Sequence, residues 1–168
     1  MPRGPRSAQR GSAMVVMLIV MVALGTIAGL TVVSVQGGSA QVGTQRFSAM
    51  ALYAAESGAA VAMAYLPAHH QSGGFDVDLG VVVPQLAGNG AKPGESGNLL
   101  SDDQQGWYEV VLLNNAADAS STDSDSILVI QSTGHGPGGA MKRIQWEVAM
   151  DTSVPGGKLT LLGWRDVF

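Results

Sequence analysis

The feature that most constrains this chain is a long apolar segment near its N-terminus. Residues 12–35 carry no charged side chain, and nearly all of these 24 residues are apolar. As an α-helix rising about 1.5 Å per residue, the segment would reach about 36 Å, enough to span a hydrocarbon core of about 30 Å. Three arginines precede it, and the next charged residue is Arg46. We therefore predict a membrane anchor whose basic N-terminal side stays cytoplasmic, so that the rest of the chain is exported.

The residues in front of the anchor indicate how it is processed. An ordinary secretory signal peptide has an apolar region of about 7–15 residues and a small-residue cleavage site behind it. Residues 38–40 (Gly-Ser-Ala) have small side chains, but the apolar segment before them is longer than that. A basic leader, then Gly11, then at once a full-length apolar helix resembles instead the type III signal of type IV prepilins. This resemblance implies that a prepilin peptidase cleaves the Gly11–Ser12 bond and that the mature protein keeps the helix.

The composition fits a small exported protein. The chain has 9 Lys+Arg and 13 Asp+Glu, for a net charge of −4, and loss of the three arginines in residues 1–11 lowers this to −7 for the remaining 157 residues. Nucleic acid is therefore not expected as a partner, because phosphate binding normally needs a basic surface. The chain has no cysteine. An exported domain without disulfides depends on its own core.

The residues after the anchor predict a second helical half. Residues 36–39 contain Gly37 and Gly38, each costing about 1 kcal/mol relative to alanine in a helix, so we expect a local weakening or kink there. A helical period resumes at residue 40 and stops before Pro67, which disfavours helix in the residue before it. Steps of three and four residues predict one face that packs on a globular domain, formed by Phe47, Met50, Ala54, Gly58, Val61 and Tyr65.

Beyond Pro67 the apolar period changes from 3.6 to 2. Alternation predicts a half-buried strand from Phe75 to Val83 and further strands at residues 107–113, 127–133, 144–150 and 159–164. The polar segment Asn114–Ser126 is expected to be an exposed, solvated loop that carries binding residues. The expected fold class is α+β and pilin-like, with a long N-terminal helix packed on a C-terminal antiparallel sheet. Its segments are a leader (1–11), a transmembrane helix (12–35), a second helical half (36–66) and a β-rich head (67–168).

Individual residues indicate which subgroup of pilins the chain resembles. Most pilins and pseudopilins have a glutamate where Val16 stands, and no carboxylate occurs here between Gly11 and Tyr53. Within the superfamily this absence is typical of PilX-type minor pilins and of the pseudopilin GspK, whose usual inserted domain does not fit in this chain. The segment Ala51–Gly58 (ALYAAESG) resembles the Ala-Ala-Glu-rich part of PilX-type helices. The chain departs from many members at Ser12, where they have phenylalanine.

Residues 133–136 (Thr-Gly-His-Gly), set between two predicted strands, also resemble the C-terminal hairpin of PilX-type proteins. Membership implies a minor pilin in the inner membrane with its head in the periplasm. Its implied partners are the prepilin peptidase, other minor pilins and the major pilin, with which it primes pilus assembly and sits at the tip. An unpaired carboxylate at membrane depth costs several kcal/mol, so a subunit with Val16 needs no subunit ahead of it. The alternative is a signal-anchored or secreted binding domain unrelated to pili, in which Val16 only improves the membrane helix.

Three further patterns could mark functional sites, but each also has a purely structural explanation. Gly25 and Gly29 form a GxxxG motif, which allows close approach of another helix but is also common in membrane helices. Residues 134–139 satisfy GxGxxG, but the following residues alternate like a strand instead of opening a helix, which predicts a hairpin loop. His69, His70 and His135 lack metal-ligand spacing and are expected to be solvated.

Three carboxylates in the polar segment 114–126 form the remaining candidate. Asp118, Asp123 and Asp125 offer oxygen ligands suited to Ca²⁺, but they lack the spacing of an EF-hand, and a solvated loop is the alternative. The sequence has no Ser/His/Asp elbow, paired-acid signature or phosphate loop. We therefore expect neither an enzyme nor a cofactor.

Overall fold

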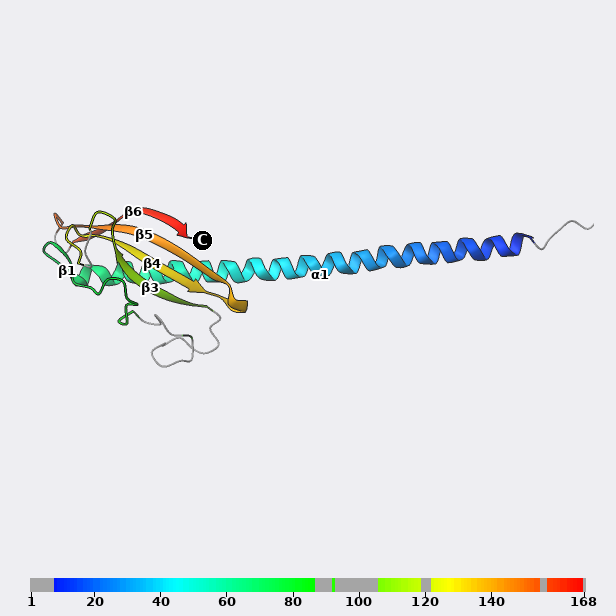
Figure 1. The fold of residues 1–168 in the computed structure, drawn as a ribbon, viewed down its shortest axis with the longest axis horizontal. Coiled ribbons are helices and arrows are strands. Elements are labelled where there is room, and N and C mark those ends of the chain that lie inside the picture. The colour runs from blue at the N-terminus through cyan, green and yellow to red at the C-terminus, as the bar shows by residue number, and fades with distance from the viewer. Residues whose placement is uncertain (1–7, 87–91, 93–105, 119–121, 155–156, 168) are drawn as a thin grey trace, which may run out of the picture. The chain divides into compact units, whose positions relative to one another are not determined.

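The computed structural model describes residues 8–86, 92, 106–118, 122–154 and 157–167, with only the backbone described for residues 8–12 and 40. The chain divides into two compact units, Met1–Gly43 and Thr44–Phe168. The helix α1 (Ala8–Tyr65) supplies all of the described first unit and the beginning of the second. The second unit adds a four-stranded antiparallel sheet, which confirms the α+β, pilin-like layout (Figure 1).

Helix α1 is 58 residues long and continues through residues 36–39 without a break. A Cβ added to Gly37 or Gly38 would have no neighbouring atom within 4 Å. The Ser39 hydroxyl donates a hydrogen bond back to the Val35 carbonyl at 3.0 Å. The penalty of about 1 kcal/mol per glycine is local, whereas backbone hydrogen bonds continue on both sides. Pro67 ends the α-helix as predicted, and the chain passes into the 3₁₀ turn η1 (Leu66–His69).

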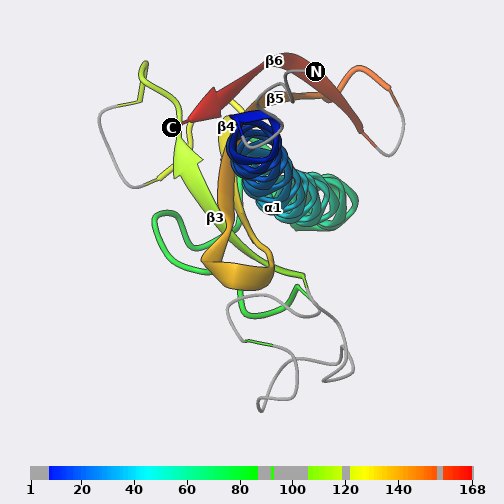
Figure 2. The same ribbon diagram turned by 90° about the vertical axis from the view of Figure 1, so that its right-hand side faces the viewer.

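The main sheet has the order β3-β4-β5-β6, and every pair is antiparallel. The four strands predicted between residues 107 and 164 are all present in this sheet. Each observed strand is longer than its prediction by one to three residues at one or both ends. They are β3 (Trp107–Asn114), β4 (Ile127–His135), β5 (Met141–Asp151) and β6 (Lys158–Val167). The sheet covers one side of α1 within the second unit and leaves the other side open (Figure 2).

The strand expected from Phe75 to Val83 is wrong. Only β2 (Gly74–Phe75) pairs, with β1 (His70–Gln71), and Val82 makes a single bridge to Val111 of β3. Gly80 interrupts the extended chain, because its φ of +79° lies in the left-handed region. Residues 77–86 therefore run along the outer edge of β3 and contact it at single points, which covers an otherwise free strand edge.

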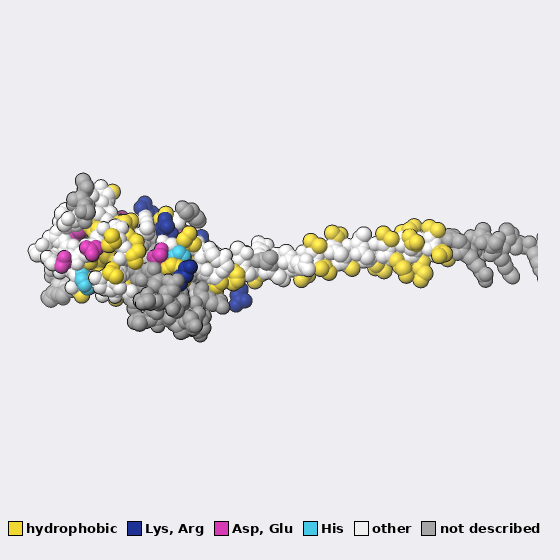
Figure 3. All heavy atoms as spheres, turned by 60° about the horizontal axis from the view of Figure 1, so that its bottom comes forward, with side chains coloured by type: hydrophobic (Ala, Val, Ile, Leu, Met, Phe, Trp, Pro, Cys, Tyr) yellow, Lys and Arg dark blue, Asp and Glu magenta, His cyan; other side chains and the backbone are white. Residues whose placement is uncertain are grey.

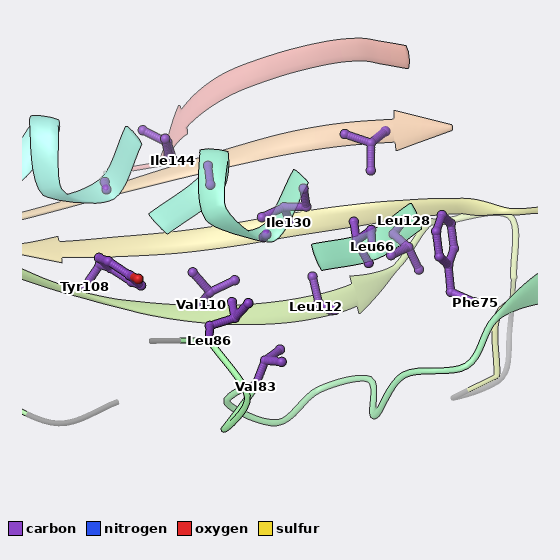
Figure 4. Close-up of a cluster of buried hydrophobic side chains, with 14 of the residues drawn as sticks. Leu66, Phe75, Val83, Leu86, Tyr108, Val110, Leu112, Leu128, Ile130 and Ile144 are labelled. Carbon is purple, nitrogen blue, oxygen red and sulfur yellow. The ribbon is translucent and has the colours of Figure 1, made fainter. Parts of the chain in front are cut away.

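The core lies between the sheet and the last four turns of α1 (Figure 4). The sheet contributes large aliphatic side chains, whereas the buried stripe of α1 consists of Ala51, Ala55, Ala59 and Ala62, with Leu66 just beyond the helix. The predicted helix face is therefore wrong at Phe47 and Val61, which are 38% and 37% exposed, whereas Gly58 is buried as expected. Met50, Ala54 and Tyr65 are half-buried.

Small residues decide which side of α1 faces the sheet. A Cβ added at Gly58 would lie 2.6 Å from Ser132 Oγ and 2.8 Å from the Tyr108 ring. One added at Gly134 of β4 would collide with the backbone of Ala51 and Ala55. The helix backbone thus packs directly against the strands, an approach that Phe47 or Tyr65 on that face would prevent.

Candidate functional site

The first candidate site is the apolar surface of α1 in the first unit. Every side chain described in residues 13–39 is exposed, including Met14 at 76% and Leu30 at 71%. Figure 3 shows this part of the helix without charged side chains. The helix is long and apolar enough to cross a membrane by length and composition. These apolar side chains are not covered by any described part of the chain, so they require an apolar environment from outside it.

The sequence-predicted residues of the anchor lie in this helix. Gly11 and Ser12 belong to the helical backbone of α1, but their side chains lie outside the described residues. Val16 is 57% exposed. A Cβ on Gly25 or Gly29 would meet nothing within 4 Å, so no described helix packs on the GxxxG motif.

Two threonine hydroxyls of this segment bond back to the helix backbone. The hydroxyl of Thr26 donates to the Ala23 carbonyl at 2.8 Å, and that of Thr31 donates to the Ile27 carbonyl at 2.6 Å. Hydroxyl groups that bond back to their own helix need no water. The segment therefore presents an almost wholly apolar surface.

The second candidate site lies in the connection between β3 and β4. Asp118, Asp123 and Asp125 come together there, with one carboxylate oxygen from each within 4.8 Å of the others. The connection also contacts β2, because Asp123 Oδ2 accepts a hydrogen bond from the Phe75 amide at 2.8 Å. The structure thus assembles the three predicted carboxylates into one cluster.

Asp123 is the buried member of the cluster. It is 4% exposed, and its Oδ1 atom is buried without a hydrogen-bond partner. Burial raises the pKa of the Asp123 carboxyl above its usual range, and the nearby Asp125 charge raises it further, whereas the hydrogen bond from the Phe75 amide opposes both effects. Burial therefore disfavours the ionised form of Asp123 in the protein alone.

The other two carboxylates are fixed by neighbouring polar groups. Asp118 accepts the Ser124 amide at 2.9 Å and the Ser124 hydroxyl at 2.6 Å, and these bonds lower the pKa of its carboxyl. Asn115 Nδ2 donates hydrogen bonds to both carboxylate oxygens of Asp125, at 2.9 and 3.1 Å. The Ile127 amide donates a third hydrogen bond to Asp125, at 3.0 Å. The cluster is held in place by hydrogen bonds from within the same connection.

The expectation of a wholly solvated loop at residues 114–126 is therefore wrong. Asn115, Asp123 and Ser126 are buried. Asn115 Oδ1 accepts the amides of Ala117 and Asp118, each at 3.0 Å, and so closes the turn that follows β3. Sequence reasoning treated these side chains as exposed because they are polar, but here they satisfy the loop backbone instead of water.

The histidines take part in aromatic contacts. His69 stacks on Tyr65 with ring centroids 3.7 Å apart, and His135 stacks on Trp107 at 3.8 Å. His70 meets Phe75 edge to face at 5.3 Å. Among the described residues, no histidine belongs to a cluster of three potential metal ligands.

The glycine-rich segment 134–139 is the predicted hairpin connection. It joins β4 to β5 through the short 3₁₀ turn η2 (Pro137–Gly139), in which Gly138 has a φ of +66°. No helix follows it, because β5 begins at Met141. The dinucleotide-binding interpretation of GxGxxG therefore has no structural support here.

One exposed feature had no clear signal in the sequence. Trp164 of β6 is 70% exposed, and it lines a shallow apolar pocket together with Leu161 of the same strand and Leu52 of α1. Period-2 alternation identified the strand but did not show that β6 lies at the edge of the sheet. The position at the edge is what leaves Trp164 uncovered.

No family model matches the chain, and no curated protein or solved structure matches it either. The fold defines the protein as α+β with a pilin-like layout and an N-terminal helix that is suited to a membrane by length and composition.

Proposed function

We propose that this chain is a PilX-type minor pilin of a type IV pilus machinery. In this proposal the prepilin is cut at Gly11–Ser12, waits in the inner membrane with its head in the periplasm, and joins other minor pilins and the major pilin. It primes pilus assembly and stays at the tip. The observation that carries the proposal is an exposed apolar segment of α1 that directly follows a basic leader ending in Gly11, in a helix with no carboxylate before Glu56.

The energetics of α1 favour a protein that moves between two apolar environments. Fifteen large hydrophobic side chains between Met14 and Val35 are exposed in the chain. Burying each is worth about 1.5 kcal/mol or more, so the whole segment gains about 20 kcal/mol from leaving water. A bilayer and a bundle of neighbouring helices both supply that gain, and the latter is the interior of a helical filament. The α+β head stays outside either environment because its core is complete without the first unit.

The intact mass of the membrane-extracted protein tests this proposal. In cells with a prepilin peptidase we expect loss of residues 1–11, and in cells without that enzyme we expect the complete chain. A cut behind residue 40 would indicate ordinary secretion, and the complete chain in both strains would indicate a simple signal anchor. Either of these results contradicts the prepilin assignment and favours a binding domain unrelated to pili.

Val16→Glu tests the position of the subunit in the pilus. A carboxylate there can pair with the terminal amine of a neighbouring subunit, and at membrane depth it costs several kcal/mol when unpaired. We expect normal cleavage, several-fold fewer pili per cell, and a shift of the protein from the tip to the shaft. Pilus counts and immunogold labelling of the head measure these effects.

Val16→Leu and Val15→Glu are the matched controls. The leucine variant keeps the surface apolar and should behave like the wild type. The Val15→Glu variant places the same charge on the adjacent position, so it should reduce the amount of protein in the membrane without moving it to the shaft. Wild-type pilus number and tip labelling in Val16→Glu, at equal protein level, would show that Val16 carries no positional information.

A further inference from the structure

We propose that the connection between β3 and β4 is a calcium site, with Asp118, Asp123 and Asp125 as its protein ligands. This site is independent of the processing and of the partners proposed above. It would tie the connection to β2 at one end of the head, because Asp123 already bonds to the Phe75 amide.

The separation of the carboxylates fits one ion of this size. Calcium binds oxygen ligands at about 2.3–2.6 Å, so two ligands of one ion lie at most about 5 Å apart. One oxygen from each of Asp118, Asp123 and Asp125 lies within 4.8 Å of the others. Magnesium, at about 2.1 Å, would need ligands no more than about 4.2 Å apart and would keep several waters. The spacing therefore suits calcium without rearrangement of the backbone.

The buried oxygen of Asp123 supplies a second and independent observation. Asp123 is 4% exposed; its Oδ2 is held by the Phe75 amide, and its Oδ1 has no hydrogen-bond partner. Buried polar atoms in folded proteins nearly always have a partner. Because Oδ2 is already engaged, Oδ1 is the oxygen of Asp123 that remains for a ligand shared with Asp118 and Asp125.

The charge of the cluster points to a cation. None of the three carboxylates forms a salt bridge within the described part of the chain, where the two ion pairs are His135–Glu109 and Lys142–Asp166. Three carboxylates with no nitrogen or sulfur ligand among them suit a hard cation such as Ca²⁺ better than Zn²⁺ or Cu²⁺.

The hydrogen bonds to Asp118 and Asp125 leave room for an ion. Each carboxylate oxygen can accept more than one interaction, so an oxygen that accepts one N–H can still bind a metal. Ser124 holds Asp118 and Asn115 holds Asp125, so these two carboxylates are positioned before any ion arrives. A positioned site loses less conformational entropy when it binds its ligand.

Calcium titration of the full chain in detergent micelles, after removal of divalent ions with EDTA, tests the proposal. Isothermal titration with CaCl₂ should show one site per chain, with a dissociation constant in the range of extracellular calcium modules, about 10⁻⁴–10⁻³ M. Tryptophan fluorescence should show a melting temperature raised by about 5 °C or more at a tenfold or greater excess over that constant. MgCl₂ should bind at least about tenfold more weakly, given the ligand spacing.

Asp123→Asn is the decisive variant. It should abolish the calcium-dependent shift, and in EDTA it should melt at a higher temperature than the wild type, because it removes a buried negative charge that lies beside two other carboxylates. Asp151→Asn is the matched control. Asp151 accepts the amide and hydroxyl of Ser153 at 2.9 and 2.6 Å, as Asp118 does with Ser124, but it does not belong to the cluster. Its calcium response should equal that of the wild type.

The proposal is overturned if the wild-type chain shows neither heat nor a melting shift with CaCl₂ up to 10 mM, a concentration about tenfold above the weakest expected constant. It is also overturned if Asp123→Asn keeps the calcium shift of the wild type. Equal affinity for Mg²⁺ would reject the assignment to calcium. Should Asp123→Asn fail to fold, Asp118→Asn provides the same comparison from an exposed position, where loss of the shift supports the site and its retention rejects it.

Discussion

Replacing Gly11 by valine will leave the precursor uncut and the cells with few or no pili. The active site of the proposed prepilin peptidase has room only for glycine at the residue before the cleaved bond. Valine is larger and branched at Cβ. The uncut chain still carries the three arginines of the leader next to its apolar helix, so it should stay in the membrane. Intact mass and a pilus count measure the two effects.

Gly25→Val is the matched control for this experiment. It makes the same substitution in the same helix, at a position where an added Cβ meets nothing within 4 Å. We expect it to be cut like the wild type. Normal removal of residues 1–11 from Gly11→Val would contradict the prepilin assignment, whatever the effect on piliation.

Gly134→Val will unfold or strongly destabilise the head. A Cβ at Gly134 would collide with the backbone of Ala51 and Ala55, which cannot move aside as the end of a flexible side chain can. To relieve that collision, α1 must move away from β4, which exposes the contact between Gly134 and the two alanines. Overpacking in a core costs about 1–3 kcal/mol and more where backbone must shift, so we expect a loss of about 3 kcal/mol or more in the free energy of unfolding.

Denaturant unfolding followed by tryptophan fluorescence, together with protein abundance in cells, measures this loss. Gly163→Val in β6 is the control, since a Cβ there meets nothing within 4 Å and valine suits a strand. It should change the free energy of unfolding by less than about 0.5 kcal/mol. A Gly134→Val protein as stable as Gly163→Val would show that α1 does not approach β4 as closely as the structure indicates.

Local pattern was sufficient for the parts of this protein that depend on local physics. The apolar run 12–35 and the change of period after Pro67 identified the helix, the four strands of the main sheet and the hairpin at residues 134–139. Each of these follows from a repeat of apolar residues or from a turn residue within a few positions. The three aspartates of the β3–β4 connection were also recognised as candidate ligands, though their spacing in the sequence did not show that they meet.

The errors arose where a choice depended on distant parts of the chain. Residues 44–65 of α1 are apolar or small on several sides, so the helical period by itself is compatible with more than one buried face. Likewise, the alternation of residues 75–83 was correct as a pattern of burial except at Val81, which is 49% exposed, since Val83 is buried and Val77 and Leu79 pack against the core. The segment did not form a strand, because Gly80, with a φ of +79°, interrupts the extended conformation.

The sequence by itself determined the apolar anchor, the α+β order and the strands, because apolar period and charge-free length act within each segment. Only the tertiary structure decided which side of α1 is buried, because close backbone contact with Gly134 favours alanines over larger side chains. It alone also decided that Asp123 is buried beside Asp118 and Asp125, because the Phe75 amide, 48 residues away in the chain, draws Asp123 into the head.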